Sequence, residues 1–382
     1  MAVVACRPQY DTIRSVSDVP FSKSKVAAFW NELESTYSQY QEIRNIRTVV
    51  HFMDTKDSLL RIDDEYLLEN INLLIHATND KLAKNDKMFL PLGNDTEVYD
   101  SKIRLNLESK HVFYHYSDDA FLIKKGEKKN LYDRNVLDGY TYKPDSFLNI
   151  FLMPYHPDQI ENGIQKFDKS GITLGTSIKI GGFLQSGDPS WDYSGLLMHE
   201  LGHALGLRHS WGSNDGCPDT PLHENCWEDS AASPCDGGIS NNFMDYNPHQ
   251  SAITPCQIAK MHSNIASIGM KANRLSEANW CDRDTSNTRI ILDHQKWIRP
   301  IQVTGDVMIQ KGGKLYLSSW LSIANDSAIY IEKGGELILD GARIYNQCGR
   351  DWHGIEKHPA GSLIISGDVQ FENVKSIVTT TL

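Results

Sequence analysis

Apolar and polar residues follow two different periodicities in the first half of the chain. Ile46–Met53 is a short apolar run rich in β-branched residues, which predicts a buried strand. Apolar residues in Asp63–Asn79 recur at helical spacing, which predicts an amphipathic helix packed on a sheet. Ile103–Leu107 alternates apolar with polar residues, as a half-buried strand does, and Val112–Tyr116 is its expected neighbour.

Two further strands and a leading helix extend this pattern. Phe147–Met153 is apolar almost throughout and predicts a central strand that ends at Pro154. Ile172–Phe183 alternates loosely and contains glycines, as a bent edge strand does. Lys25–Ile43 predicts a helix, which is either a pro-segment remnant or an N-terminal brace. The order of these elements predicts an α+β fold.

The segment 198–209, Met-His-Glu-Leu-Gly-His-Ala-Leu-Gly-Leu-Arg-His, contains the strongest chemical signal. His199 and His203 are four residues apart, so on a helix their imidazoles lie on one face, one turn apart, and can bind one ion. Gly206 is able to adopt the positive φ that ends a helix, which brings His209 back to the same ion. Three protein ligands and an open fourth position are typical of catalytic zinc. Glu200 is then placed to act as a general base.

The eleven residues from His199 to His209 resemble the extended zinc signature of the metzincin metallopeptidases. Met244 follows in Asn-Asn-Phe-Met-Asp-Tyr, and the resemblance implies that it forms the Met-turn beneath the three imidazoles. A lone Met is more often ordinary core, but its position behind a complete signature favours the Met-turn. Tyr246 matches a tyrosine that several metzincins direct at the metal or the scissile carbonyl; the alternative is a packed aromatic.

Within the metzincins, Gly216–Pro221 and the Met-Asp-Tyr form of the turn resemble the pappalysin family. The resemblance covers roughly residues 46–274. It implies a catalytic domain with a twisted mixed sheet, a zinc helix and a C-terminal helix, and it implies hydrolysis of proteins or peptides. Substrate is expected to lie extended along the edge strand Ile172–Phe183, with side-chain preference set by the wall around Asn247–Thr254.

Four cysteines lie around this predicted site: Cys217, Cys226, Cys235 and Cys256. The family resemblance implies that Cys217 pairs with Cys235 and Cys226 with Cys256, although four cysteines allow three connectivities. A second zinc on these cysteines is disfavoured because the chain has no close Cys-x-x-Cys pair. Related peptidases also carry calcium in this loop, and the residues here with suitable oxygens are Asp215, Asp219, Thr220 and Glu224.

Residues 210–250 are rich in Asp, Asn, Pro, Ser and Cys and cannot bury enough apolar surface to fold without disulfides. Thr254 and Pro255 then predict a helix start, with Thr254 as the N-cap and Pro255 at the first helical position. Residues 275–288 are polar and predict a linker.

The remaining tail is repetitive. Val307–Leu317 returns 22 residues later as Ile329–Leu339, each with a Gly-Gly pair, and a looser third copy passes through Gly361, Leu363 and Ile365. Alternating strands at a fixed short period predict an all-β, solenoid-like stack, and a β-sandwich of hairpins is the alternative. A stack that ends soon after its third copy suggests a truncated parent.

Composition narrows the function further. The 382 residues carry a net charge of −11 and contain no basic cluster of the kind that phosphate recognition needs, which disfavours nucleic acid as a partner. The sequence has no run of apolar residues long enough to span a membrane and no visible signal peptide. Val3–Cys6 resembles the end of a lipoprotein signal but lacks its apolar stretch. Because the cysteines favour an oxidising compartment, we expect a secreted or cell-surface protein whose targeting segment precedes this sequence.

These observations predict four regions: an N-terminal segment over 1–45, a zinc peptidase domain over 46–274, a linker over 275–288 and a β-repeat region over 289–382. The function that they favour is a secreted zinc endopeptidase with Glu200 as the general base. The alternative is a catalytically inactive surface protein that binds or adheres through its C-terminal repeats.

Overall fold

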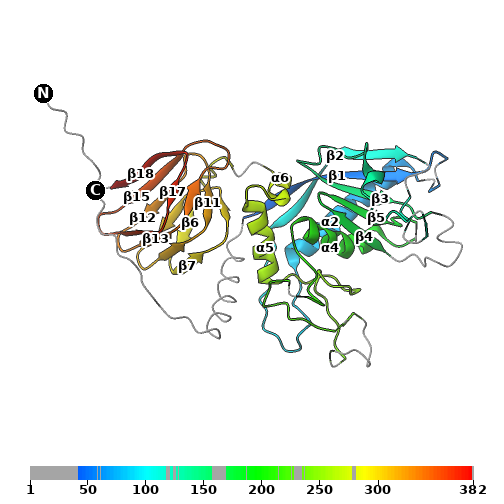
Figure 1. Cartoon of the computed structure of the whole chain (residues 1–382), viewed down its shortest axis with the longest axis horizontal. Coiled ribbons are helices and arrows are strands. Elements are labelled where there is room, and N and C mark those ends of the chain that lie inside the picture. Colours follow the sequence, from blue (N-terminus) through cyan, green and yellow to red (C-terminus); the bar gives the residue numbers. More distant parts are fainter. Residues whose placement is uncertain are drawn as a thin grey trace. The chain divides into compact units, whose positions relative to one another are not determined.

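The computed structural model describes residues 42–380 except 58, 61, 118–120, 124–125, 128, 157–168, 186, 214, 225, 228–234, 236 and 278–280. Within these residues the chain forms two compact units, divided between Glu277 and Ala278 (Figure 1). The helix expected over Lys25–Ile43 falls almost wholly outside the described residues. In the described part of the chain, no helix has the length and apolar character needed to span a membrane.

A mixed five-stranded sheet forms the centre of the first unit. Its strands, in the order in which they lie side by side, are β2 (Ile103–Tyr116), β1 (Arg44–Asp54), β3 (Leu148–Met153), β5 (Ser177–Gly181) and β4 (Ser170–Leu174). All neighbours are parallel except β4 and β5, which are antiparallel. Every residue of β3 is buried, as expected for a central strand covered on both faces. The predicted α+β class is therefore confirmed.

The structure corrects two strand predictions. Ile103–Leu107 and Val112–Tyr116 belong to one long strand, β2, whose register with β1 shifts between Thr48 and Val50. Ile172–Phe183 is two strands rather than one, because Gly175 has a φ of +76° and reverses the chain between β4 and β5. Of these two strands, β4 lies at an edge of the sheet, whereas β5 lies inside it and is wholly buried.

Helices pack against the sheet. Within the described residues, the helices of this unit are α2 (Asp64–Lys84), η1 (Asn135–Leu137), η2 (Ser190–Tyr193), α4 (Ser194–Ala204), α5 (Pro255–Ala266) and α6 (Lys271–Leu275). α2 and α4 contact each other and join the sheet in the main hydrophobic core (Figure 1). A smaller cluster around Phe151, Met153 and Tyr155 packs on the other face.

The start of α5 confirms the predicted cap. The Thr254 hydroxyl oxygen accepts a hydrogen bond from the backbone N–H of Gln257, and Oε1 of Gln257 accepts one from the backbone N–H of Thr254. Pro255 occupies the first helical position, where its missing N–H costs nothing. This capping box fixes the orientation of α5 relative to the loop that precedes it.

The second unit contains three parallel sheets, and the chain visits them in turn. Its strands are β6 (Arg289–Ile291), β7 (His294–Trp297), β8 (Ile301–Val303), β9 (Val307–Ile309), β10 (Lys314–Leu317), β11 (Trp320–Ile323), β12 (Ala328–Ile331), β13 (Glu336–Asp340), β14 (Arg343–Tyr345), β15 (Trp352–Lys357), β16 (Ser362–Ser366), β17 (Gln370–Phe371) and β18 (Val374–Thr380). The sheets have the strand orders β16-β13-β10-β7, β17-β14-β11-β8 and β18-β15-β12-β9-β6.

Strand pairing in this unit follows the sequence repeat. Lys314 pairs with Glu336 and Val307 with Ile329, so equivalent residues of the first two copies lie next to each other. A sandwich of hairpins would need antiparallel neighbours, whereas every pair of named strands here is parallel. The hairpin alternative is therefore wrong for the described residues.

Each Gly-Gly pair combines two different backbone requirements. Gly312 and Gly334 have φ of +86° and +79°, the left-handed region that favours glycine. A Cβ on Gly335 would lie 2.3 Å from the carbonyl oxygen of Ile309 in the preceding circuit of the chain. The third copy has Ala360 in place of the first glycine but keeps Gly361, so the close approach is the stricter requirement.

We predict that Gly335→Ala destabilises the second unit more than Gly312→Ala does. The Gly335 contact is with backbone and cannot be relieved by a rotamer change, so about 2 kcal/mol or more should be lost. Gly312 has open space around it, so Gly312→Ala should cost only about 1 kcal/mol, the penalty for a side chain in the left-handed conformation. Chemical denaturation of both variants measures the difference, and equal losses would contradict this explanation.

Candidate active site

Helix α4 and the turn after it bring three histidines together. His199 and His203 project from the same side of the helix, with ring centroids 4.8 Å apart. Gly206, at φ +92°, turns the chain, and His209 returns so that its ring centroid lies 4.7 Å from that of His203. One nitrogen from each of the three rings lies within 4.8 Å of the others. The structure thus brings the three predicted ligands to one point.

Backbone carbonyls orient two of these rings. Nδ1 of His199 lies 2.6 Å from the carbonyl oxygen of Phe243, and Nδ1 of His203 lies 3.0 Å from that of Leu207. A carbonyl only accepts, so both Nδ1 atoms carry the proton and both Nε2 atoms present a lone pair. Nε2 of His203 lies 3.0 Å from Nε2 of His209. Such a short approach of two imidazole nitrogens suits a proton or a cation shared between them.

Burial keeps the three imidazoles neutral. The pKa of His199 is lowered to about 3 and that of His209 to about 4, mainly because burial removes solvent from the charged ring. Burial also lowers the pKa of His203. A neutral imidazole is the form that binds a metal, so protons do not compete for these nitrogens near neutral pH.

Glu200 is buried beside the histidines and is only 4% exposed. Burial raises its pKa to about 7, although hydrogen bonding from Thr173 acts in the opposite direction. The Thr173 hydroxyl lies 2.7 Å from Oε2 of Glu200. Gly171 leaves the space that this carboxylate occupies, because a Cβ there would lie 3.0 Å from Oε1. Strand β4 therefore sets both the position and the proton affinity of Glu200.

Met244 is fully buried and packs directly against α4. A Cβ on Gly202, between His199 and His203, would lie 2.4 Å from the Met244 sulfur and 2.9 Å from the ring of Phe243. The amide of Asn242 holds the turn, because it accepts from the backbone N–H of Met244. The segment around Met244 thus packs against the helix that carries His199 and His203.

Tyr246 lies at the open side of the histidines and is 48% exposed. Its ring centroid is 4.7 Å from that of His209 and 5.8 Å from that of His199. Trp211 and Trp227 pack against the same ring. Burial and the Glu200 carboxylate raise the pKa of the Tyr246 phenol, so it remains a proton donor at neutral pH. Within the described residues, no hydrogen bond ties its hydroxyl to a backbone group.

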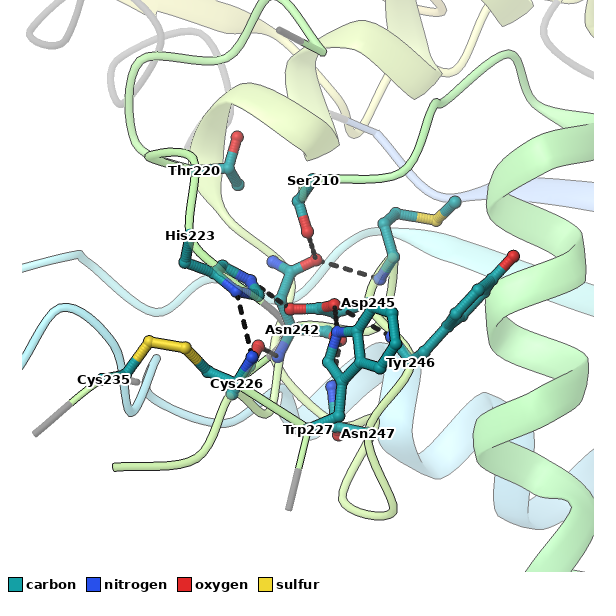
Figure 2. Close-up of polar contacts among 12 residues, drawn as sticks. Ser210, Thr220, His223, Cys226, Trp227, Cys235, Asn242, Asp245, Tyr246 and Asn247 are labelled. Carbon is teal, nitrogen blue, oxygen red and sulfur yellow. Dashed lines mark hydrogen bonds and ion pairs between the residues drawn. A yellow bond between two sulfur atoms is a disulfide. The ribbon is translucent and has the colours of Figure 1, made fainter. Parts of the chain in front are cut away.

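Asp245 connects this turn to the loop that precedes it (Figure 2). Its buried carboxylate accepts from Nε2 of His223 at 2.5 Å and from Nε1 of Trp227 at 2.6 Å. It also accepts from the backbone N–H of Tyr246 at 2.9 Å. Burial by itself would raise the pKa of Asp245, but hydrogen bonds from His223, Ser240 and Trp227 outweigh that effect and lower it. Asp245 is therefore a buried anion whose partners come from both segments.

The disulfide pairing that the family resemblance implied is wrong. The structure pairs Cys217 with Cys256 and Cys226 with Cys235, at Cα–Cα distances of 5.5 and 5.9 Å. The cause is a contact between segments distant in sequence: Asp219 accepts from Thr254 Oγ1 and from the Cys256 backbone N–H, which holds the Cys217 segment on the start of α5. Cys226 and Cys235 then close a short loop beside His223 (Figure 2).

A third disulfide, between Cys281 and Cys348, lies in the second unit with a Cα–Cα distance of 6.0 Å. Sequence reasoning assigned no role to either of these cysteines. Calcium binding stays a prediction. Asp215 accepts from Thr220 and from the backbone of Cys217, and Asp219 accepts from the start of α5. Among the described residues, no metal-capable group of side chains combines Asp215, Asp219 and Glu224.

The three histidines and Glu200 open into a cleft of about 1390 Å³. Strand β4 forms one side, and the residues after Met244, including Asn247 and Gln250, form the other. Sequence reasoning did not identify Thr173, Asp245 or His223 as parts of the site. Asp245 was detectable in principle, since it lies between Met244 and Tyr246, but its two donors come from a loop without periodicity.

Three converging imidazoles beside a buried carboxylate in an open cleft define the class of metal-dependent hydrolases. Residues 130–266 match the family model Peptidase_M43, described as pregnancy-associated plasma protein-A. This segment is therefore similar to that family, the pappalysins, and the match supports a metalloendopeptidase. Zinc is the metal expected for such enzymes, and their substrates are proteins or peptides.

Solved structures of mirolysin also match the chain. "Mirolysin in complex with compound 9" is 17% identical, covers 62% of this chain and 96% of its own, and has a TM-score of 0.43. Mature mirolysin from Tannerella forsythia in complex with a cleaved peptide is 18% identical, with the same two coverages and a TM-score of 0.41. Comparison with curated proteins gave no match.

We predict that Asp245→Asn lowers the free energy of unfolding by about 2 to 4 kcal/mol, because it removes a buried charge that His223 and Trp227 stabilise. The folded-state pKa of Asp245 is lowered, so its contribution is present above the unfolded-state pKa and is lost as the pH falls through the folded one. Denaturant titrations should therefore give a constant difference from wild type at neutral pH that shrinks in strong acid. Asp138→Asn, an exposed change, is the control. A difference that grows in acid would contradict the assignment.

Proposed function

We propose that the chain is a zinc endopeptidase in which His199, His203 and His209 bind the metal and Glu200 is the general base. The observation that carries this proposal is the convergence of three neutral imidazoles beside one buried carboxylate on the floor of a single cleft. Each of the four residues comes from the eleven-residue signature.

The donor set fits zinc. Three imidazole nitrogens are typical zinc ligands, and a site with three protein ligands leaves a position for water or substrate. The carbonyls of Phe243 and Leu207 fix the tautomers of His199 and His203 so that Nε2 is available in both. Zinc bound here would polarise the scissile carbonyl and lower the pKa of an attacking water toward 7.

Glu200 would accept the proton of the attacking water and pass it to the leaving amine. A pKa of about 7 suits both transfers near neutral pH. Thr173 holds Oε2 and leaves Oε1 for the proton transfer. No covalent intermediate with the protein is required.

Strand β4 would bind the substrate backbone. It pairs with β5 along one edge only, and four of its five residues line the cleft beside Glu200. An extended peptide is able to add to such an edge by main-chain hydrogen bonds, which places the scissile bond across the histidines. Of the predicted edge strand Ile172–Phe183, only Ile172–Leu174 belongs to β4, which begins at Ser170.

We also propose that the enzyme acts outside the cell, supported by three disulfides that an oxidising compartment would maintain. For residues 289–382 we propose a β-solenoid, supported by three parallel sheets in which equivalent repeat residues are neighbours. Residues 1–45 and 275–288 remain assigned to an N-terminal segment and a linker on sequence grounds.

We predict that the four signature residues separate into two classes. His199→Ala, His203→Ala and His209→Ala should each lose tightly bound zinc and all casein cleavage, because a ligand is removed. Glu200→Gln should retain zinc but lose turnover, because only the proton acceptor is removed.

Metal analysis of the purified variants, with casein cleavage measured beside it, tests both classes. Zinc retained in full by a histidine variant would remove that residue from the ligand set. A wild type that binds zinc but cleaves nothing would favour the alternative of a catalytically inactive binding protein.

We predict that Tyr246→Phe lowers kcat about a hundredfold or more while KM and zinc content change little. The phenol lies beside His199 and His209 and is placed to donate to the oxyanion that develops on the scissile carbonyl; such a donor is typically worth about 2.7 to 4 kcal/mol. The ring is kept, so its packing on Trp211 and Trp227 survives. An unchanged kcat, or a loss that a lower melting temperature explains, would return Tyr246 to a packing role.

A further inference from the structure

One end of the cleft lies between the first turn of α4 and the residues after the Met-turn. Gly195, Gln250 and Lys81 line this end. Gly195 is one helical turn before His199, so the position is adjacent to the proposed metal site. Gln250 connects Lys81 to the turn after Met244, because its backbone carbonyl oxygen lies 3.3 Å from Nζ of Lys81 and its side-chain Nε2 donates to the carbonyl oxygen of Asp245 at 2.8 Å.

Lys81 brings a partly buried ammonium group to this end of the cleft. It comes from the last turn of α2, and its hydrogen bond to Gln250 uses one of three N–H donors. Among the described residues, no carboxylate lies within 4 Å of its Nζ, and no second hydrogen-bond acceptor is present. Burial lowers the pKa of Lys81, while Asp86 and Asp192 oppose that effect. A carboxylate from outside would satisfy the remaining donors.

The glycine at position 195 keeps this ammonium accessible. A Cβ there would lie 3.4 Å from Nζ of Lys81 and 3.2 Å from Cβ of Gln250. Any side chain longer than a methyl group would extend into the space in front of the lysine. The small residue therefore leaves room at the end of the cleft for part of a substrate.

The charge around Lys81 also differs from that of the whole chain. The net charge is −11, yet the charged residues that line the cleft are Lys81, Lys169, Lys271, Asp192 and Glu200. Lys169 is already paired with Asp188 and Asp192, at 3.8 and 3.5 Å. Lys271 lies beside Gly175, after strand β4, whereas Lys81 lies beside Gly195 in the first turn of the helix that carries His199. Lys81 is thus the cation best placed to bind a substrate anion next to the proposed metal site.

We propose that Lys81 forms a carboxylate-binding subsite, so that the enzyme prefers peptides with Glu or Asp beside the cleaved bond. This inference rests on the proposed peptidase function and names its substrate class. The ammonium pairs with the substrate side chain through charge-assisted hydrogen bonds while Gln250 holds the lysine in place. Lys81 is a specificity residue and takes no part in proton transfer.

The test compares internally quenched peptides that have Glu, Gln or Lys beside the cleaved bond, each made with a blocked and with a free C-terminus. Mass spectrometry of peptides released from casein locates the bond first. Wild type should cleave the Glu peptide with a kcat/KM about tenfold or more above that of the Gln peptide. Lys81→Met should remove most of this preference by lowering the Glu value alone. Lys84→Met is the matched control, since this exposed lysine of the same helix turn pairs with Asp80.

The outcomes separate the two proposals. One outcome is that Lys81→Met lowers kcat/KM for the Glu and Gln peptides equally, with zinc content and melting temperature unchanged. That result would overturn the subsite and leave the proposed peptidase activity intact. If the preference appears only when the peptide C-terminus is free, the carboxylate that binds is the terminal one and the side-chain subsite is wrong. If wild type loaded with zinc cleaves no peptide, the proposed function fails and the subsite with it.

Discussion

The close packing of the Met-turn against helix α4 is the contact on which the rest of the site depends. Gly202 has no room for a Cβ, because Met244 and Phe243 occupy that space. This approach lets the carbonyl oxygen of Phe243 reach Nδ1 of His199 at 2.6 Å and fix its tautomer. A larger residue at 202 would separate the turn from the helix and release that ring. The glycine inside the helix, unfavourable for helix stability by itself, is explained by this contact.

Several independent contacts hold the Met-turn in this position. Asn242 exchanges side-chain hydrogen bonds with Gln257, which belongs to the capping box of α5, so the turn is fixed to the start of that helix. On the other side of the turn, the Asp245 carboxylate accepts hydrogen bonds from His223 and Trp227 (Figure 2). A loop that lacks its own hydrophobic core thus gains order through a buried anion and two disulfides rather than through apolar packing. The packing of Trp211 and Trp227 against Tyr246 depends on the same arrangement.

Features set by local spacing were predictable from sequence, whereas features set by distant contacts were not. The segment His199–His209 and the Thr254 cap depend only on helical periodicity and short-range hydrogen bonds, and the structure places both as expected. The division of Ile172–Phe183 depends on one positive φ at a glycine, which alternation does not reveal. Disulfide partners were wrong because pairing depends on where Cys217 lies in space. Lys81 and Gln250 are 169 residues apart in the sequence, so no local sequence pattern predicts their contact.

Burial acts in opposite directions on the bases and the acid of this site, and both effects favour metal chemistry. It lowers the pKa of His199 to about 3 and of His209 to about 4, so these imidazoles remain neutral and free to bind a cation. It raises the pKa of Glu200 to about 7, since a carboxylate is costly without water. A dication on the histidines would lower that pKa again, because an opposite charge nearby favours the ionised acid. Burial at the cleft floor thus provides neutral ligands for a cation and a carboxylate that ionises more readily once that cation is bound.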